Sequence, residues 1–155
     1  EYFMEAYDIA NGISDTTVQN ALFCQNIASI FSKKEDFKEA AEWLKKSVDI
    51  YWDLVGIGHP DFQNSCFALI NAYEELERYE DADAFIRLLL QRADEESGPV
   101  NQVSAYCHLR LGNLYLYAWH RRKARKEYKA ARNIFTQLGD EEGLSLAEEA
   151  ISDME

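Results

Sequence analysis

A spacing of 42 residues recurs along this chain and constrains its fold more than any other feature. At this spacing an apolar residue, an aromatic residue and an alanine each occur three times. The three sets are Ile27, Leu69 and Leu111; Phe31, Tyr73 and Tyr115; and Ala40, Ala82 and Ala124. Alanine lets two antiparallel helices approach closely, and the apolar residues around it fill the space between them. The sequence therefore predicts an all-α stack of antiparallel helix pairs, in which each pair covers the apolar face of the next.

The spacing within each copy resembles the tetratricopeptide repeat. In the third copy, the apolar Leu111 and small Gly112 are followed by an aromatic residue, Tyr115, and then by Ala124. Two stretches are similar to the kinesin light chain type of this repeat, namely Gln25-Asn26-Ile27-Ala28 and Val55-Gly56-Ile57-Gly58-His59-Pro60. The resemblance implies a right-handed α-α superhelix, or solenoid, with a C-terminal capping helix.

We expect one domain over residues 1–155. Its expected parts are a partial preceding helix (1–14), three repeats (15–58, 59–98 and 99–139) and the capping helix (140–155). Pro60 and Pro99 suit the start of a helix. Because Pro99 lies farther before Gly112 than Pro60 lies before Ile70, the first helix of the third repeat is expected to start earlier than its counterpart.

The composition indicates a packed intracellular protein. Hydrophobic residues make up 47% of the 155 residues, which excludes the disordered class. The sequence has no apolar run of about 18 residues and no signal pattern, so we expect no membrane insertion and a cytoplasmic location. Cys24 and Cys66 occupy the same repeat position, and neighbouring equivalent helices lie about 8–10 Å apart or more, beyond the disulfide limit of about 7 Å. We therefore expect free, buried thiols.

No motif predicts catalysis, and we expect neither a metal nor another cofactor. His59, His108 and His120 lack metal-ligand spacing, and the cysteines form no Cys-x-x-Cys pair. No glycine-rich phosphate loop or nucleophile elbow is present. Acidic runs such as 94–96 are typical of solvated helix ends.

The resemblance also implies a binding site, because the first helices of such repeats line a concave groove that holds an extended or helical peptide of a partner protein. The matching residues are Gln25, Ser29 and Lys33; Asn64, Phe67, Asn71 and Glu74; and Tyr106, Leu109, Arg110, Asn113 and Leu116. Spacings of three and four place each set on one helix face. For Asn71 and Asn113, peptide contact and structural hydrogen bonding between helices stay open as alternatives.

Charge is unevenly distributed in a chain whose net charge is −12. Residues 100–139 contain 8 bases and 1 acid, whereas residues 140–155 contain 7 acids. The bases concentrate at Arg121, Arg122, Lys123, Arg125, Lys126, Lys129 and Arg132, and we expect them mainly on the outer, convex side. They are either an exposed face neutralised by neighbours such as residues 140–142 or a second docking surface for an acidic partner, such as the acidic end of another copy. The acidic whole argues against nucleic acid as a partner.

These observations predict a protein–protein interaction module that acts as an adaptor or scaffold. Two alternatives belong to other classes. One is a structural segment of a longer superhelix that self-associates through its end faces, and the other is a regulatory domain of a larger protein.

Overall fold

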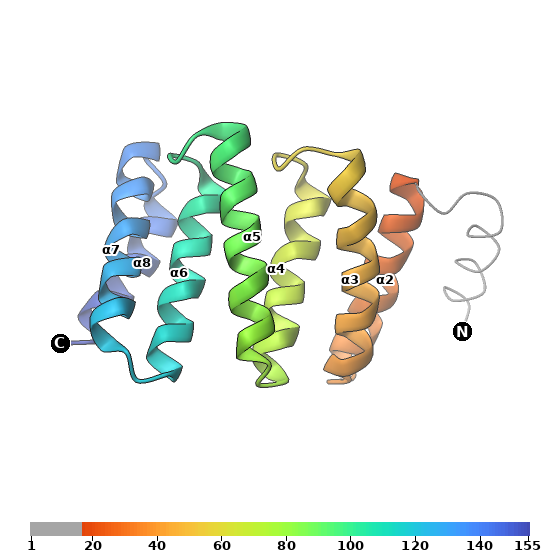
Figure 1. Ribbon diagram of the computed structural model, residues 1–155, viewed down its shortest axis with the longest axis horizontal. Helices are drawn as coiled ribbons and strands as arrows, with labels where there is room; N and C mark the ends of the chain where they lie inside the picture. The colour runs from red at the N-terminus through yellow and green to blue at the C-terminus, as the bar shows by residue number, and fades with distance from the viewer. Residues whose placement is uncertain (1–16) are drawn as a thin grey trace. The chain divides into compact units, whose positions relative to one another are not determined.

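The structure, a computed structural model, describes residues 17–155, which form seven helices and no strand (Figure 1). The helices are α2 (Val18–Lys33), α3 (Phe37–Leu54), α4 (Pro60–Glu75), α5 (Tyr79–Ser97), α6 (Gln102–Tyr117), α7 (Arg121–Leu138) and α8 (Glu141–Ser152). They form two compact units, which meet in the sequence between Arg78 and Tyr79, so that the first contains α2 to α4 and the second α5 to α8. The all-α prediction is confirmed. The partial helix expected within residues 1–14 lies outside the described residues.

The period of 42 residues extends to the helix boundaries. The first helices of the pairs begin at Val18, Pro60 and Gln102, and the second helices begin at Phe37, Tyr79 and Arg121. The expectation that the first helix of the third repeat starts earlier is therefore wrong.

Asn101 is the physical reason why α6 begins at Gln102 rather than at Pro99. Its side-chain oxygen accepts a hydrogen bond from the Ser104 amide (2.8 Å), and its amide nitrogen donates to the Gly98 carbonyl (2.7 Å). This N-cap satisfies a backbone donor that the helix leaves unpaired. Pro99 consequently stays in the loop between α5 and α6.

The turn between the two helices of a pair has the same backbone conformation in all three pairs. One residue of each turn lies in the left-handed region, and these residues are Glu35, Glu77 and Trp119, with φ of 59°, 56° and 61°. The next amide donates to the carbonyl of the repeated aromatic residue, from Asp36 to Phe31 (2.9 Å), from Arg78 to Tyr73 (2.8 Å) and from His120 to Tyr115 (2.8 Å). Such six-residue closures satisfy carbonyls at a helix end. The turn therefore fixes where each second helix begins.

In the first unit, α3 packs against both α2 and α4. Ala40, Leu44 and Tyr51 of α3 are at most 1% exposed. A buried polar bridge also joins the three helices, because the Ser47 hydroxyl on α3 donates to the Ala21 carbonyl of α2 (2.9 Å) and lies 3.0 Å from the Ser65 hydroxyl of α4.

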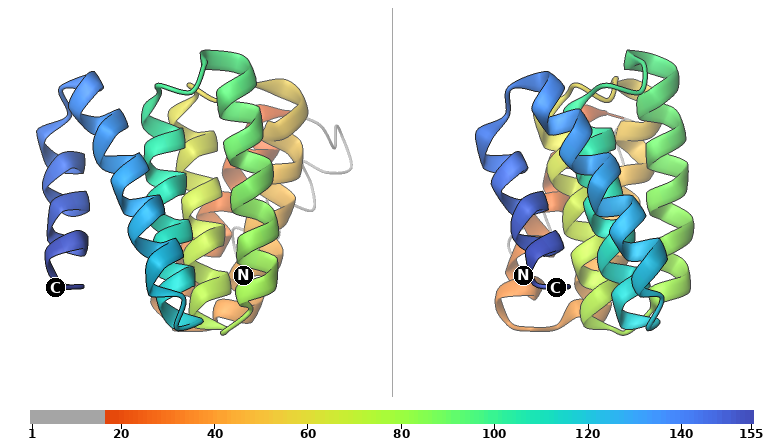
Figure 2. Two further views of the ribbon diagram at one scale, coloured as in Figure 1. Left: turned by 60° about the vertical axis from the view of Figure 1, so that its left-hand side comes forward. Right: turned by 90° about the vertical axis from the view of Figure 1, so that its left-hand side faces the viewer.

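In the second unit, α7 packs against α6 and α8, and α8 also touches α6; Figure 2 shows α8 beside α7. Packing is very close at Gly112 of α6, where a Cβ atom would lie 2.4 Å from the ring of Tyr128 on α7. Tyr128 is 1% exposed, so its ring is enclosed by neighbouring residues. A glycine is required at position 112 because the facing side chain is large.

The three cysteines all lie within the described residues, where they are buried and form no disulfide, as expected. Among residues 17–155, no helix is both long enough and apolar enough to cross a membrane. Within the same residues, no three His, Cys, Asp or Glu side chains come together as metal ligands would.

Replacement of Gly112 by alanine should destabilise the fold. The new methyl group would overlap the Tyr128 ring, and overpacking costs roughly 1–3 kcal/mol. The higher helix propensity of alanine, worth about 1 kcal/mol, offsets only part of this cost. Urea denaturation of the Gly112→Ala variant measures the net loss.

A double variant supplies the matched control. The first repeat has Ala28 and Leu44 at the positions of Gly112 and Tyr128, and both are 1% exposed. Gly112→Ala combined with Tyr128→Leu copies that pair and should recover part of the lost stability. A Gly112→Ala protein as stable as the parent would mean that the helices do not approach this closely.

Candidate functional site

The residues predicted to line the peptide groove lie on the first helices of the pairs, α2, α4 and α6. In the first unit, Ser29, Lys33, Asn64 and Asn71 are exposed, while Gln25, Phe67 and Glu74 are half-buried. In the second unit, Leu109 is buried, whereas Tyr106, Arg110, Asn113 and Leu116 are half-buried. The face of each first helix is thus accessible in part.

The second unit brings four of the predicted residues together around a pocket of about 290 Å³. Tyr106, Leu109, Arg110 and Asn113 line it from α6, and Leu146 and Ala150 line it from α8. The fifth predicted residue of this helix, Leu116, packs against the core cluster of the unit and does not line the pocket.

The apolar part of the pocket is anchored in the core. The Tyr106 ring meets the ring of buried Phe135 edge to face, with 5.0 Å between centroids. Burial raises the pKa of the Tyr106 hydroxyl, and the nearby charges of Asp140 and Glu142 raise it further. Leu109 is 8% exposed and belongs to the same core cluster as Tyr128. These side chains therefore present a fixed apolar surface.

The polar part of the pocket depends on Asn113. The Tyr128 hydroxyl donates to the side-chain oxygen of Asn113 (2.7 Å), and burial raises the pKa of Tyr128 to about 12. Within residues 17–155 the Asn113 amide nitrogen donates no hydrogen bond. Of the two alternatives for Asn113, the structural hydrogen bond is present, and contact between the amide nitrogen and a peptide stays a prediction.

Sequence reasoning missed Leu146 and Ala150, because it treated the segment after residue 139 as a capping helix. Helix α8 contacts α7 and α6 much as α4 contacts α3 and α2. Continuation of the 42-residue period would begin this helix at residue 144, but it begins at Glu141 after a loop of only two residues. Only a search that allowed this three-residue shift could have identified α8 as a further first helix.

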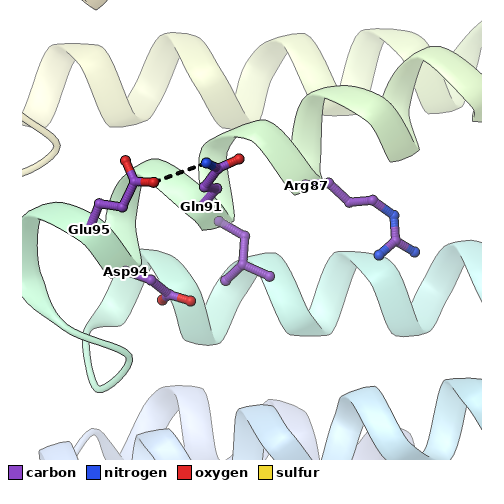
Figure 3. Close-up of a pocket in the computed structure, with 5 residues that line it drawn as sticks. Arg87, Gln91, Asp94 and Glu95 are labelled. Atoms are coloured by element: carbon purple, nitrogen blue, oxygen red, sulfur yellow. Dashed lines mark hydrogen bonds between the residues drawn. The ribbon is translucent and has the colours of Figure 1, made fainter.

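A second, more open hollow of about 500 Å³ lies on α5 and was also missed (Figure 3). Arg87, Leu90, Gln91, Asp94 and Glu95 line it. Its polar groups have protein partners, because the Arg87 guanidinium donates to Asp83 (3.0 Å) and Tyr115 (2.8 Å), Gln91 donates to Glu95 (2.9 Å), and Ser104 donates to Asp94 (2.6 Å). These hydrogen bonds indicate that the lining side chains stabilise α5 and its contact with α6.

The bases predicted to form a second docking surface lie on α7. Arg122, Lys126 and Lys129 are exposed, and Arg125 is half-buried. The structure thus places these four side chains outside the core of the unit.

Replacement of Tyr128 by phenylalanine tests the support beneath Asn113. The ring is kept and only the hydroxyl that bonds Asn113 is lost, so the free energy of unfolding should fall by about 0.5–1.5 kcal/mol. Urea denaturation provides the measurement. Tyr117→Phe is the control, because Tyr117 is 58% exposed and loss of its hydroxyl should change the free energy of unfolding by no more than about 0.5 kcal/mol. Equal losses in the two variants would contradict the assigned role of the Tyr128 hydroxyl.

Comparison with known proteins identifies the fold. No family model and no curated protein matches the sequence. Among solved structures, BtubC (BKLC) from P. vanneervenii aligns with a TM-score of 0.78 at 16% identity, over 98% of this chain and 62% of that chain. The apo form of RapI aligns with a TM-score of 0.78 at 15% identity, over 97% of this chain and 55% of that chain.

A third structure contains the tetratricopeptide-like repeats of a putative kinesin light chain from Podosopora anserina. It aligns with a TM-score of 0.73 at 16% identity, over 89% of this chain and 69% of that chain. This chain therefore spans less than two thirds of the length of BtubC and of RapI. By its fold, the chain is a tetratricopeptide-like repeat protein.

Proposed function

We propose that this protein binds a peptide segment of a partner protein on the faces of its first helices, and that it acts as an adaptor or scaffold without catalysis. Repeats of this fold are commonly used for protein–protein interaction, and their stacked helices offer extended binding surfaces. The observation that carries the proposal is the pocket between α6 and α8, where four residues of the predicted groove meet.

The pocket combines the features that peptide recognition requires. Tyr106 and Leu109 offer an apolar surface for one side chain of the peptide. The Asn113 amide nitrogen can donate to a peptide carbonyl, because the oxygen of the same side chain is already held by Tyr128. In the first unit, the half-buried Gln25 lies on the first helix α2, as Asn113 lies on the first helix α6.

The test begins with a peptide selected by the whole protein from a random library, and its affinity is measured by fluorescence anisotropy. Leu146→Ala removes an exposed wall of the pocket and should weaken Kd by roughly fivefold, the effect of about 1 kcal/mol of lost apolar contact. Leu88→Ala is the matched control, because Leu88 is also exposed, lies on α5 and does not line this pocket. Its Kd should match that of the parent.

Asn113→Ala adds a polar test of the same pocket and should weaken Kd by roughly two- to tenfold, as expected for one lost hydrogen bond. Circular dichroism confirms that each variant is folded. If the selected peptide binds all three variants with the parent's affinity, the α6–α8 pocket is not the peptide site.

A further inference from the structure

Helix α7 carries five cations outside its buried face, three of them exposed and two half-buried. These are Arg122, Arg125, Lys126, Lys129 and Arg132, called here the α7 stripe. Spacings of three and four place them on one face of the helix. The buried residues, which occupy the other face, are Ala124, Tyr128, Ala131, Ile134 and Phe135. The stripe therefore extends along about 15 Å of helix, given a rise of about 1.5 Å per residue.

Ion pairs within residues 17–155 do not neutralise the stripe. Within the described part of the chain, none of its five cations has an ion-pair partner. The two acids nearest in sequence have other partners, since Glu127 binds the His108 ring (2.7 Å) and Asp140 accepts from Gln102 (2.9 Å) and from the Gly143 amide (2.9 Å). A surface neutralised by residues 140–142 through ion pairs is therefore not what the structure shows.

The cations outside the stripe have contacts within the second unit. Arg121 donates to the Met154 carbonyl, and the Lys123 ammonium lies 5.6 Å from the centroid of the Tyr115 ring. Arg121 and Lys123 flank Arg122 in the sequence, so cations with such contacts stand directly beside a stripe cation that has no ion pair within residues 17–155.

Helix stability does not account for the stripe. Like charges three and four residues apart repel one another. Cations in the first turn, such as Arg122, also face the positive end of the helix dipole, and His120 gives α7 no side-chain capping bond. Helix α8 has the opposite and favourable arrangement, with Asp140 as N-cap and two acids in the first turn.

Exposed aromatic residues lie directly before the stripe in the chain. Trp119 is 87% exposed, and Tyr117 is 58% exposed and stacks on Tyr79 with 5.2 Å between ring centroids. Trp119 holds the left-handed turn position that Glu35 and Glu77 hold in the other two turns. Exposed aromatic side chains of this size are enriched among the residues that dominate binding energy.

We propose that the α7 stripe is a docking surface for an acidic segment of a partner protein, and that Trp119 and Tyr117 receive an apolar side chain of the same segment. Charge complementarity supports this occupant, because carboxylates would supply the partners that the stripe lacks within the protein. A short peptide fits a stripe of this length. A nucleic acid duplex requires a broad positive surface, whereas the net charge of this chain is −12.

The probe is fluorescein-labelled polyglutamate, whose binding to the whole protein is followed by fluorescence anisotropy at low salt. The combined reversal of Arg122→Glu, Lys126→Glu and Lys129→Glu should weaken Kd by at least about tenfold. The difference should shrink at high salt, where exposed charges are screened. The matched control reverses three exposed lysines of the first unit, with Lys34→Glu, Lys38→Glu and Lys45→Glu. It changes the net charge equally and should leave Kd within about twofold of the parent value.

A second probe, polyglutamate that ends in leucine, tests the aromatic part of the surface. Trp119→Ala should weaken its binding without affecting polyglutamate itself. An equal effect of Trp119→Ala on both probes, or no effect on either, would overturn the assignment of Trp119 as an apolar contact.

Four results would overturn the acidic-segment proposal. The first is the absence of polyglutamate binding at low salt, and the second is an equal loss of binding in the two triple variants. The third is tighter binding of a DNA duplex than of polyglutamate to the same stripe. The fourth is a concentration-dependent dimer, measured by sedimentation, that the α7 reversal abolishes, because the occupant would then be a second copy of this chain.

Discussion

The close approach of two helices within a pair is the contact on which the rest of this structure depends. Ala40 and Ala124 are fully buried on the second helices of their pairs. On a first helix, Gly112 must also be small, since even one added carbon would overlap the Tyr128 ring. Side-chain volume at these positions therefore sets the distance between helices, and helix packing is sensitive to a single methyl group.

This close approach also orients a polar side chain of the candidate site. Once Tyr128 packs on Gly112, its hydroxyl reaches Asn113 on the next position of α6. A core contact thus orients a polar side chain at the edge of a pocket. Preorganised groups of this kind lose little entropy when a ligand binds.

The second unit carries two surfaces of different chemistry on different helices. The pocket of α6 and α8 is mainly apolar, with one amide side chain held in place. The α7 stripe is cationic, with three exposed and two half-buried side chains, and it depends on charge rather than on shape. Because charge attraction is screened by salt and apolar contact is not, ionic strength separates the two surfaces experimentally.

The sequence by itself determined the period, and with it the helices. The repeated alanines and aromatics predicted antiparallel helix pairs, because helix packing and turn closure act on residues that are close in the sequence. The same pattern predicted that the cysteines are buried. The prediction from Pro99 that α6 starts earlier was wrong, because the hydrogen bonds of the Asn101 cap determine where this helix begins.

Tertiary structure alone decided how the candidate site is closed. Residues Leu146 and Ala150 join the pocket because α8 packs against α7 and touches α6, although its start departs from the 42-residue period by three residues. Tertiary structure also decided which side chain bonds to each polar group. The sequence identified Asn113, Glu127 and Asp140 as polar, but only the fold shows that Tyr128, His108 and Gln102 bind them. The physical reason is that these partners lie 15 to 38 residues away in the chain, so a local pattern carries no information about them.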